Sequence, residues 1–189
     1  MEGWPRDPGS DGVPLTPPAR PDASPRLPIL ASYERAFPPD IVAYTDGSAP
    51  SRKHPHVPAG VASAAVWWEH PTEPSGGHRR LLLSPSDGAP VVNRAELTAI
   101  LWALRHTERR VIATDSLVAM HQVRGYLTFP RRYALHPLFP VLREVANALM
   151  DRLRVGIETT MLKVPAHAGV RGSEWADWHA SEALLDPGS

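Results

Sequence analysis

The sequence predicts an α/β fold, in which a mixed five-stranded sheet carries helices on both faces. Three strand-like runs come first, and helices and strands alternate after them, an order that such sheets share. One segment repeats leucine and isoleucine side chains at helical spacing, and several short runs are rich in β-branched residues. The length of 189 residues suits one domain with an appendage.

The first 39 residues predict a disordered or polyproline-like tail, followed by one domain over residues 40–186. The tail is rich in Pro, Gly, Ser, Asp and Arg, and segments such as Thr16–Pro21 cannot form a helix or an interior strand. Two interpretations stay open. We favour a linker from a larger polyprotein over a docking segment for a proline-recognising partner.

Three strands are expected at the start of the domain. Their ranges are 41–45, 60–68 and 79–84. The connector between the second and third is rich in Pro, Gly and Ser, which favours an antiparallel hairpin. The loop before the second strand carries His54 and His56. We interpret it as a surface loop, because no third metal ligand accompanies the two histidines.

A helix follows, because leucine and isoleucine recur at positions i, i+3, i+4 and i+7 between Leu97 and Leu104. A strand, a short helix, a longer helix, a fifth strand and a last helix complete the order. Their expected ranges are 111–114, 117–123, 138–149, 155–164 and 173–184.

Composition excludes several classes of protein. The chain has no Cys, which excludes a disulfide framework and a Cys-ligated zinc site. No apolar run approaches the ~20 residues that span a bilayer, and no signal peptide is recognisable, so we expect a soluble intracellular protein without membrane contact. The cytoplasm and the nucleus both stay open as its location. The formal net charge is zero, which does not indicate a polyanionic partner. The clustering of arginines leaves two interpretations open, a local basic track and an ordinary mixed surface.

Four acidic residues stand in distinct local contexts and are candidate metal ligands. Asp46 and Asp115 each end an apolar, strand-like run, whereas Glu96 and Asp177 lie in helical stretches. Carboxylates at the ends of two strands and on two helices can converge in one oxygen-rich pocket. Such a pocket suits hard divalent cations and phosphoryl chemistry.

Taken singly, each candidate also has a structural explanation. Asp46 precedes a glycine, which is a turn signal, and Glu96 can interact with the helix dipole. Asp115 can cap the helix that follows, and Asp177 can lie on a solvated helix face. His167, ten residues before Asp177, can be a hydrogen-bonding loop residue. The coincidence of all five in this order favours a shared site.

The order of these motifs resembles that of type I ribonuclease H. The matching stretches are Tyr44–Ser48, Asn93–Ile100, Ala113–Ser116, Pro165–Gly169 and Glu174–Asp177. The resemblance covers residues 40–184, and its fourth motif is most similar to ribonuclease H domains of non-LTR retroelements. It implies the ribonuclease H-like fold and an endonuclease that hydrolyses the RNA strand of RNA/DNA hybrids. The products would carry 5′-phosphate and 3′-hydroxyl ends.

The same resemblance implies the roles of the five candidate residues. The four acids would bind two Mg²⁺ ions, for which Mn²⁺ can substitute. Asp46 would bridge both ions, Glu96 and Asp115 would bind one, and Asp177 would bind the other. His167 would move a proton or assist product release.

Five further residues are predicted to contact the substrate. The resemblance implies that Asn93 lies beside the RNA strand, where an amide can both donate to and accept from a 2′-hydroxyl. Asn93 can also be the N-cap of its helix, and the two roles are compatible. Arg94 is expected to contact a phosphate. Gly47, Ser48 and Ser116, beside the acids, complete the set.

Three positions depart from the family pattern. Val92, Leu117 and Ser173 stand where a polar residue, glutamine and asparagine are usual. None is a predicted metal ligand, so the departures bear on hybrid affinity rather than on the reaction. The segment Gly125–His136, with the pair Arg131–Arg132, is a short counterpart of the basic protrusion with which some members grip the hybrid.

Two other functions stay open. One is a catalytically silent nucleic-acid-binding domain of retroelement origin. The complete set of acids makes this function less favoured. The other is a nuclease of the same fold with a different substrate, although Asn93 and the spacing of His167 from Asp177 favour the hybrid. The expected partners are an RNA/DNA hybrid and reverse transcriptase within a larger polyprotein, and the domain itself is expected to be a monomer.

Overall fold

The computed structural model describes residues 37–52, 54–85 and 91–185, so the predicted tail lies outside the described residues up to position 36. Five strands form one sheet in the order β3-β2-β1-β4-β5. They are β1 (Val42–Ser48), β2 (Ala62–Trp68), β3 (Gly77–Leu83), β4 (Val111–Thr114) and β5 (Thr160–Lys163). The first three strands pair antiparallel, whereas β1, β4 and β5 run parallel. The prediction of a mixed five-stranded sheet is confirmed.

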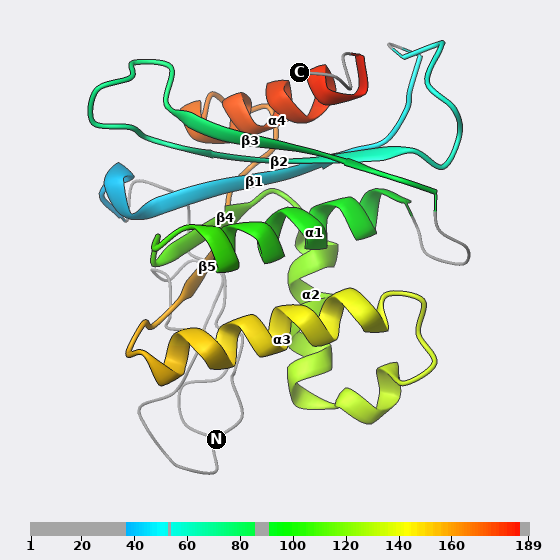
Figure 1. Ribbon diagram of the computed structural model, residues 1–189, viewed down its shortest axis with the longest axis vertical. Coiled ribbons are helices and arrows are strands. Elements are labelled where there is room, and N and C mark those ends of the chain that lie inside the picture. The colour runs from blue at the N-terminus through cyan, green and yellow to red at the C-terminus, as the bar shows by residue number, and fades with distance from the viewer. Residues whose placement is uncertain (1–36, 53, 86–90, 186–189) are drawn as a thin grey trace.

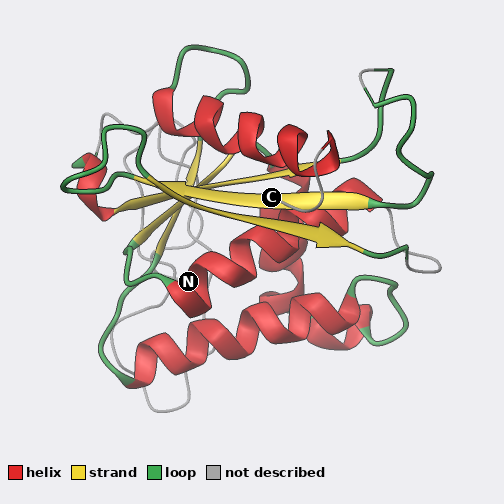
Figure 2. Cartoon of the chain, turned by 45° about the horizontal axis from the view of Figure 1, so that its top comes forward, coloured by secondary structure: helices red, strands yellow, loops and turns green. Residues whose placement is uncertain are grey.

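Helices cover the two faces of the sheet unequally (Figure 1). The longer helices are α1 (Val91–His106), α2 (Leu117–Thr128), α3 (Phe139–Arg154) and α4 (Arg171–Leu185). The first three lie on one face, and α4 lies alone on the other (Figure 2). Short 3-10 turns precede β1 and follow α2, at Pro39–Ile41 and Pro130–Tyr133. No helix among the described residues is long and apolar enough to cross a membrane.

The sheet separates two hydrophobic clusters. Alternate side chains of a strand point to opposite faces, so Ala43 packs with α1 to α3, whereas Val42 and Tyr44 pack with α4. The start of α4 lies very close to β1, since a Cβ at Gly172 would be 2.2 Å from the ring of Tyr44. Glycine at this position therefore allows α4 to pack against the strand that carries Asp46.

Several element boundaries differ from the prediction, among them those of α2 and β5. The second helix continues to Thr128 instead of ending near residue 123, and the fifth strand covers only residues 160–163 of the expected 155–164. The strand is shorter because the chain first closes α3, where the amides of Gly156 and Ile157 donate back to the last turn. Gly156 has a φ of 79°, a conformation that a continuous strand does not use.

The surface-loop interpretation is wrong for His54. Its side chain is buried, with Nδ1 3.2 Å from the hydroxyl of Ser51 and Nε2 3.0 Å from the hydroxyl of Ser181 on α4. His56 is exposed, as expected. His54 therefore connects the loop before β2 to α4 and has a structural role.

Candidate active site

Three of the four predicted acids lie together. Asp46, Glu96 and Asp115 each offer a carboxylate oxygen within 4.8 Å of the others, and they form the one group of this kind found among the described residues. Asp46 and Glu96 are 4% and 6% exposed, and Asp115 is half-buried. The parallel pairing of β1 with β4 sets Thr45 opposite Thr114, which makes the acids that follow them neighbours.

Asp46 lies within β1 and not in a turn. Asp46, Gly47 and Ser48 pair with residues of β2, so the interpretation of Asp-Gly as a turn signal is wrong here. Gly47 has a different role, because a Cβ at this position would lie 2.6 Å from the backbone nitrogen of Glu96. Its lack of a side chain lets α1 approach β1 and brings Glu96 close to Asp46.

Asp177 completes the acidic set from α4, on the opposite side of the sheet from α1. It is half-buried and is not part of the group within 4.8 Å. Its charge nevertheless raises the pKa of Asp46, Glu96 and Asp115, and a hydrogen bond with Asp177 further raises that of Asp46. All four acids therefore interact electrostatically, and we call them the acidic centre.

The acidic centre holds protons strongly. Burial raises the pKa of Asp46 well above its ordinary value, and the charges of Glu96 and Asp115 raise it further. Burial also raises the pKa of Glu96 to about 8, to which the charge of Asp115 contributes. Carboxylates in such proximity cannot all ionise at neutral pH unless a cation offsets their repulsion.

The donor atoms fit a divalent cation. Oxygen Oε2 of Glu96 is buried and has no hydrogen-bond partner among the described residues. A buried acceptor without a donor is unusual in a folded protein, and a metal ion would satisfy it. A site made only of carboxylate oxygens suits hard ions such as Mg²⁺ or Mn²⁺.

Lys163 is a charged neighbour that the sequence analysis did not single out. Burial raises the pKa of Asp115, and the positive charge of Lys163 opposes that rise. Lys163 is the last residue of β5 and pairs with Thr114, directly before Asp115. Its position at the end of a strand parallel to β4 was the signal that could have identified it.

The predicted substrate-binding residues differ in how far their side chains are already hydrogen-bonded within the protein. Asn93 is half-buried and is the third residue of α1, so the N-cap interpretation is wrong. The guanidinium of Arg94 donates to the carbonyl of Ser84 after β3, which ties it to the protein. Ser116 is the N-cap of α2, where its hydroxyl accepts from the amide of Ala119 at 3.1 Å. Ser48 ends β1 opposite Ser63.

His167 is exposed in the loop that joins β5 to α4. Its φ of 53° makes it the one non-glycine residue with positive φ in the part of the chain that the structure describes. Such a conformation is uncommon outside glycine and persists where the surrounding structure holds it. Its ring has no hydrogen-bonding partner among the described residues, which leaves it available to a ligand.

A further hollow lies at the end of α2. A cavity of about 420 Å³ is lined by His121, Arg124, Gly125, Thr128 and Phe129. The guanidinium of Arg132, which follows this cavity in the sequence, lies 4.2 Å from the centre of the Phe129 ring. This region coincides with the start of the segment predicted as a short basic protrusion.

The sequence matches the RNase H family over residues 38–185. A sequence search of curated proteins gave no match. Among solved structures, the foamy viral protease-reverse transcriptase in complex with dsDNA superposes with a TM-score of 0.56 at 18% identity, over 78% of this chain and 97% of that chain. The PFV RNase H domain gives 0.53 at 17% identity, over 77% and 94% of the two chains.

A third structure, LC9-RNase H1, is described as a type 1 RNase H with the type 2 active-site motif. It gives a TM-score of 0.50 at 20% identity, over 76% of this chain and 71% of that chain. At such identities the structural likenesses establish the fold, and the sequence match establishes the family. The chain therefore belongs to the ribonuclease H family, and its activity is that of a ribonuclease H.

Proposed function

We propose that this ribonuclease H is an endonuclease that hydrolyses the RNA strand of RNA/DNA hybrids with two divalent metal ions, leaving 5′-phosphate and 3′-hydroxyl ends. One observation carries the proposal. Carboxylate oxygens from β1, α1 and the end of β4 lie within 4.8 Å of one another, and Asp177 on α4 acts on all three through its charge.

Each acid has a proposed part in binding the ions. Asp46 lies between the other carboxylates in the electrostatic network and would bridge both ions, while Glu96 and Asp115 would bind one and Asp177 the other. When bound, a pair of Mg²⁺ or Mn²⁺ ions supplies hydroxide for attack on the phosphodiester and stabilises the leaving 3′ oxygen. The protein contributes a buried carboxylate arrangement in which Oε2 of Glu96 has no hydrogen-bond partner among the described residues.

Asn93 is the proposed reader of the 2′-hydroxyl. It lies three residues before Glu96 on α1, and residues at this spacing are neighbours on a helix surface. Since its amide does not cap the helix, it can donate to and accept from a ligand beside the acidic centre. Arg94 and the residues Gly47, Ser48 and Ser116 remain proposed substrate contacts.

Two further features support a nucleic-acid substrate. The cavity at the end of α2 and the arginines that follow it offer cations to phosphate groups of the hybrid. His167, exposed in its loop, would move a proton or help to release the cleaved phosphate. We also propose that the domain, from residue 40 to 186, works beside reverse transcriptase in a polyprotein of retroelement origin, as a monomer.

A nuclease of the same fold with another substrate is the second candidate. The observation that favours it is apolar exposure at two positions where family members usually carry polar residues. Val92 and Leu117 are each 42% exposed, which reduces the polar surface offered to a hybrid near the acidic centre. Neither residue belongs to the acidic centre, so this alternative changes the substrate and keeps the chemistry.

A substrate panel separates the candidates. Labelled RNA/DNA hybrid, duplex RNA, duplex DNA and single-stranded RNA would each be incubated with Mg²⁺, Mn²⁺ or EDTA. The proposal expects cleavage of the hybrid alone, with either metal and not with EDTA. The products should carry 5′-phosphate and 3′-hydroxyl ends, so a ligase should be able to join them without prior phosphorylation. Preferred cleavage of another substrate would support the second candidate, and cleavage of none would support a silent binding domain.

A further inference from the structure

The loop that carries His167 is fixed at its ends and exposed between them. Val164 at its upstream end is buried, and its amide donates to the carbonyl of Thr114 at 2.9 Å. Val170 at its downstream end is also buried, whereas residues 165–169 are exposed. The conformation of His167, with its positive φ, therefore depends on how firmly both ends are held.

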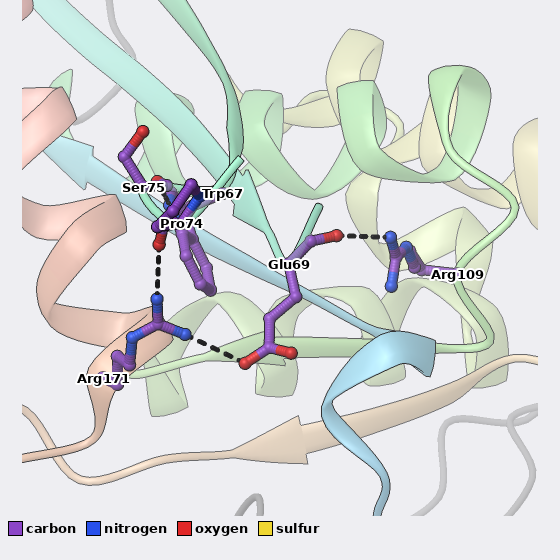
Figure 3. Close-up of polar contacts among 6 residues, drawn as sticks. All are labelled: Trp67, Glu69, Pro74, Ser75, Arg109 and Arg171. Carbon is purple, nitrogen blue, oxygen red and sulfur yellow. Dashed lines mark hydrogen bonds and ion pairs between the residues drawn. The ribbon is translucent and has the colours of Figure 1, made fainter. Parts of the chain in front are cut away.

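At the downstream end, the exposed residue Arg171, the first of α4, connects the loop to another part of the chain. Its guanidinium donates from Nη1 to Oε1 of Glu69 at 2.9 Å and from Nη2 to the carbonyl of Pro74 at 2.8 Å (Figure 3). Both partners belong to the connection between β2 and β3. The amide of Gly169 in the loop donates at 3.1 Å to the carboxylate of Glu174, in the first turn of α4.

The partners of Arg171 are themselves fixed to the sheet. The carbonyl of Glu69 accepts from the guanidinium of Arg109 at 2.8 Å, and the indole of Trp67 donates to the carbonyl of Ser75 at 2.8 Å (Figure 3). The guanidinium of Arg171 also lies 5.1 Å from the centre of the Trp67 ring. Arg171 thus links the His167 loop to the segment between β2 and β3, which is itself hydrogen-bonded to its surroundings.

We propose that Arg171 is a positioning residue for catalysis, which fixes the downstream end of the loop so that His167 keeps its working conformation. The inference rests on the proposed function, in which His167 serves the cleavage step. Arg171 touches no reacting atom in this role. The two directional bonds to Glu69 and Pro74 make it sensitive to the geometry of the cation and not only to its charge.

Three variants and a control test the proposal. Arg171→Met removes both hydrogen bonds and keeps the length of the side chain, Arg171→Lys keeps the charge, and Glu69→Gln keeps the acceptor without the charge. Arg154→Met is the matched control, because Arg154 is an exposed arginine paired with a carboxylate, that of Asp151, on α3. Melting temperatures show which variants remain folded.

The expected effect is on kcat. A small misplacement of a catalytic group lowers rates strongly, so we expect Arg171→Met to lower kcat on the hybrid about tenfold with KM within about twofold of the wild type. Arg171→Lys and Glu69→Gln should have smaller effects, and Arg154→Met none. An unchanged kcat, or a defect confined to KM, would overturn the proposal, and the second result would identify Arg171 as a substrate contact.

A double-mutant cycle shows whether Arg171 acts through His167. In a His167→Ala background, which we expect to lower kcat by ~10²-fold, Arg171→Met should have little further effect on kcat. An equal loss in both backgrounds would overturn the proposal, because Arg171 would then act on the fold or on Asp177, which lies on the same helix.

Hydrogen exchange tests the positioning independently of activity. Without substrate, Arg171→Met should speed amide exchange in residues 166–171, whereas Arg154→Met should leave these amides unchanged. Unchanged exchange in Arg171→Met would overturn the proposal even if kcat fell. If the wild type cleaves no hybrid, the proposed function fails, and the exchange data still decide whether Arg171 fixes the loop.

Discussion

Among the residues that the structure describes, Arg152 and the acidic centre are two places where charge is buried, and their surroundings are opposite. Arg152 of α3 is 4% exposed, and its guanidinium donates to the carbonyls of Leu104, Thr107 and Arg109 at 2.7–2.9 Å. Asp46 and Glu96 of the acidic centre are buried to a similar extent, but here carboxylates lie close to other carboxylates. Oxygen Oε2 of Glu96 has no hydrogen-bond partner among the described residues.

The buried charge of Arg152 stabilises the fold, whereas the carboxylates of the acidic centre repel one another. Burial lowers the pKa of Arg152 to about 10, so Arg152 remains charged at neutral pH and connects α3 to the end of α1. Burial raises the pKa of Glu96 to about 8, so the metal-free centre retains protons. The carbonyls that satisfy Arg152 come from the protein, whereas the cation that would satisfy the acids does not.

The largest expected effect is the loss of activity in Asp115→Asn. The amide keeps the shape of the side chain but cannot neutralise a cation, so kcat should fall by several orders of magnitude. The melting temperature should not fall, since the substitution removes the repulsion that Asp115 exerts on Asp46 and Glu96. Asp151→Asn, at an exposed carboxylate on α3, is the control. Near-normal cleavage by Asp115→Asn, or cleavage in excess EDTA, would refute metal binding by this residue.

Arg152→Met should have the converse effect, a loss of stability without a specific loss of activity. Several buried carbonyls would lose their donor, and each unsatisfied group costs roughly 1–3 kcal/mol. We expect the free energy of unfolding to fall by about 3 kcal/mol, measured by denaturant titration, with kcat unchanged at temperatures where the variant is folded. A stable variant would mean that water replaces the guanidinium at these carbonyls.

Asn93→Ala should have a smaller effect, confined to substrate recognition. Loss of a polar contact to the 2′-hydroxyl should weaken binding by ~1–3 kcal/mol, seen as a higher KM for the hybrid at nearly constant kcat. Because Asn93 does not cap α1, the melting temperature should change little. A lower melting temperature with an unchanged KM would assign the residue a structural role instead.

The sequence predicted the parts of the fold that depend on local pattern. Leucine spacing identified α1, and the runs that end at Thr45 and Thr114 identified two strands whose parallel pairing brings Asp46 and Asp115 together. The order of acids identified the family before any geometry was known. Gly47 was assigned to a turn because its actual role, the approach of α1 to β1, depends on a contact between distant segments.

Interactions between distant segments also explain what the sequence did not predict. Arg152 lay in a run of arginines on an amphipathic helix, and only the tertiary fold brings the carbonyls of Leu104 and Arg109 to it. The contact of Arg171 with Glu69 spans 102 positions and depends on the path of the β2–β3 connection. Local patterns carry no information about such pairs.

The effect of Mg²⁺ on stability at two pH values tests the central claim most directly. Raised carboxyl pKa values mean that the folded state binds more protons than the unfolded state between about pH 4 and pH 8. Without metal, this contribution to stability is present at low pH and is lost as the pH rises through that window. Mg²⁺ competes with these protons, so it should bind and stabilise most at the upper end.

The measurement is the melting temperature of the wild type and Asp115→Asn at pH 5 and pH 8.5, with and without millimolar Mg²⁺. We predict that Mg²⁺ raises the melting temperature of the wild type by a few degrees at pH 8.5, by much less at pH 5, and hardly at all in the variant. A melting temperature that Mg²⁺ leaves unchanged at pH 8.5, or raises equally in the variant, would contradict a metal site at the acidic centre.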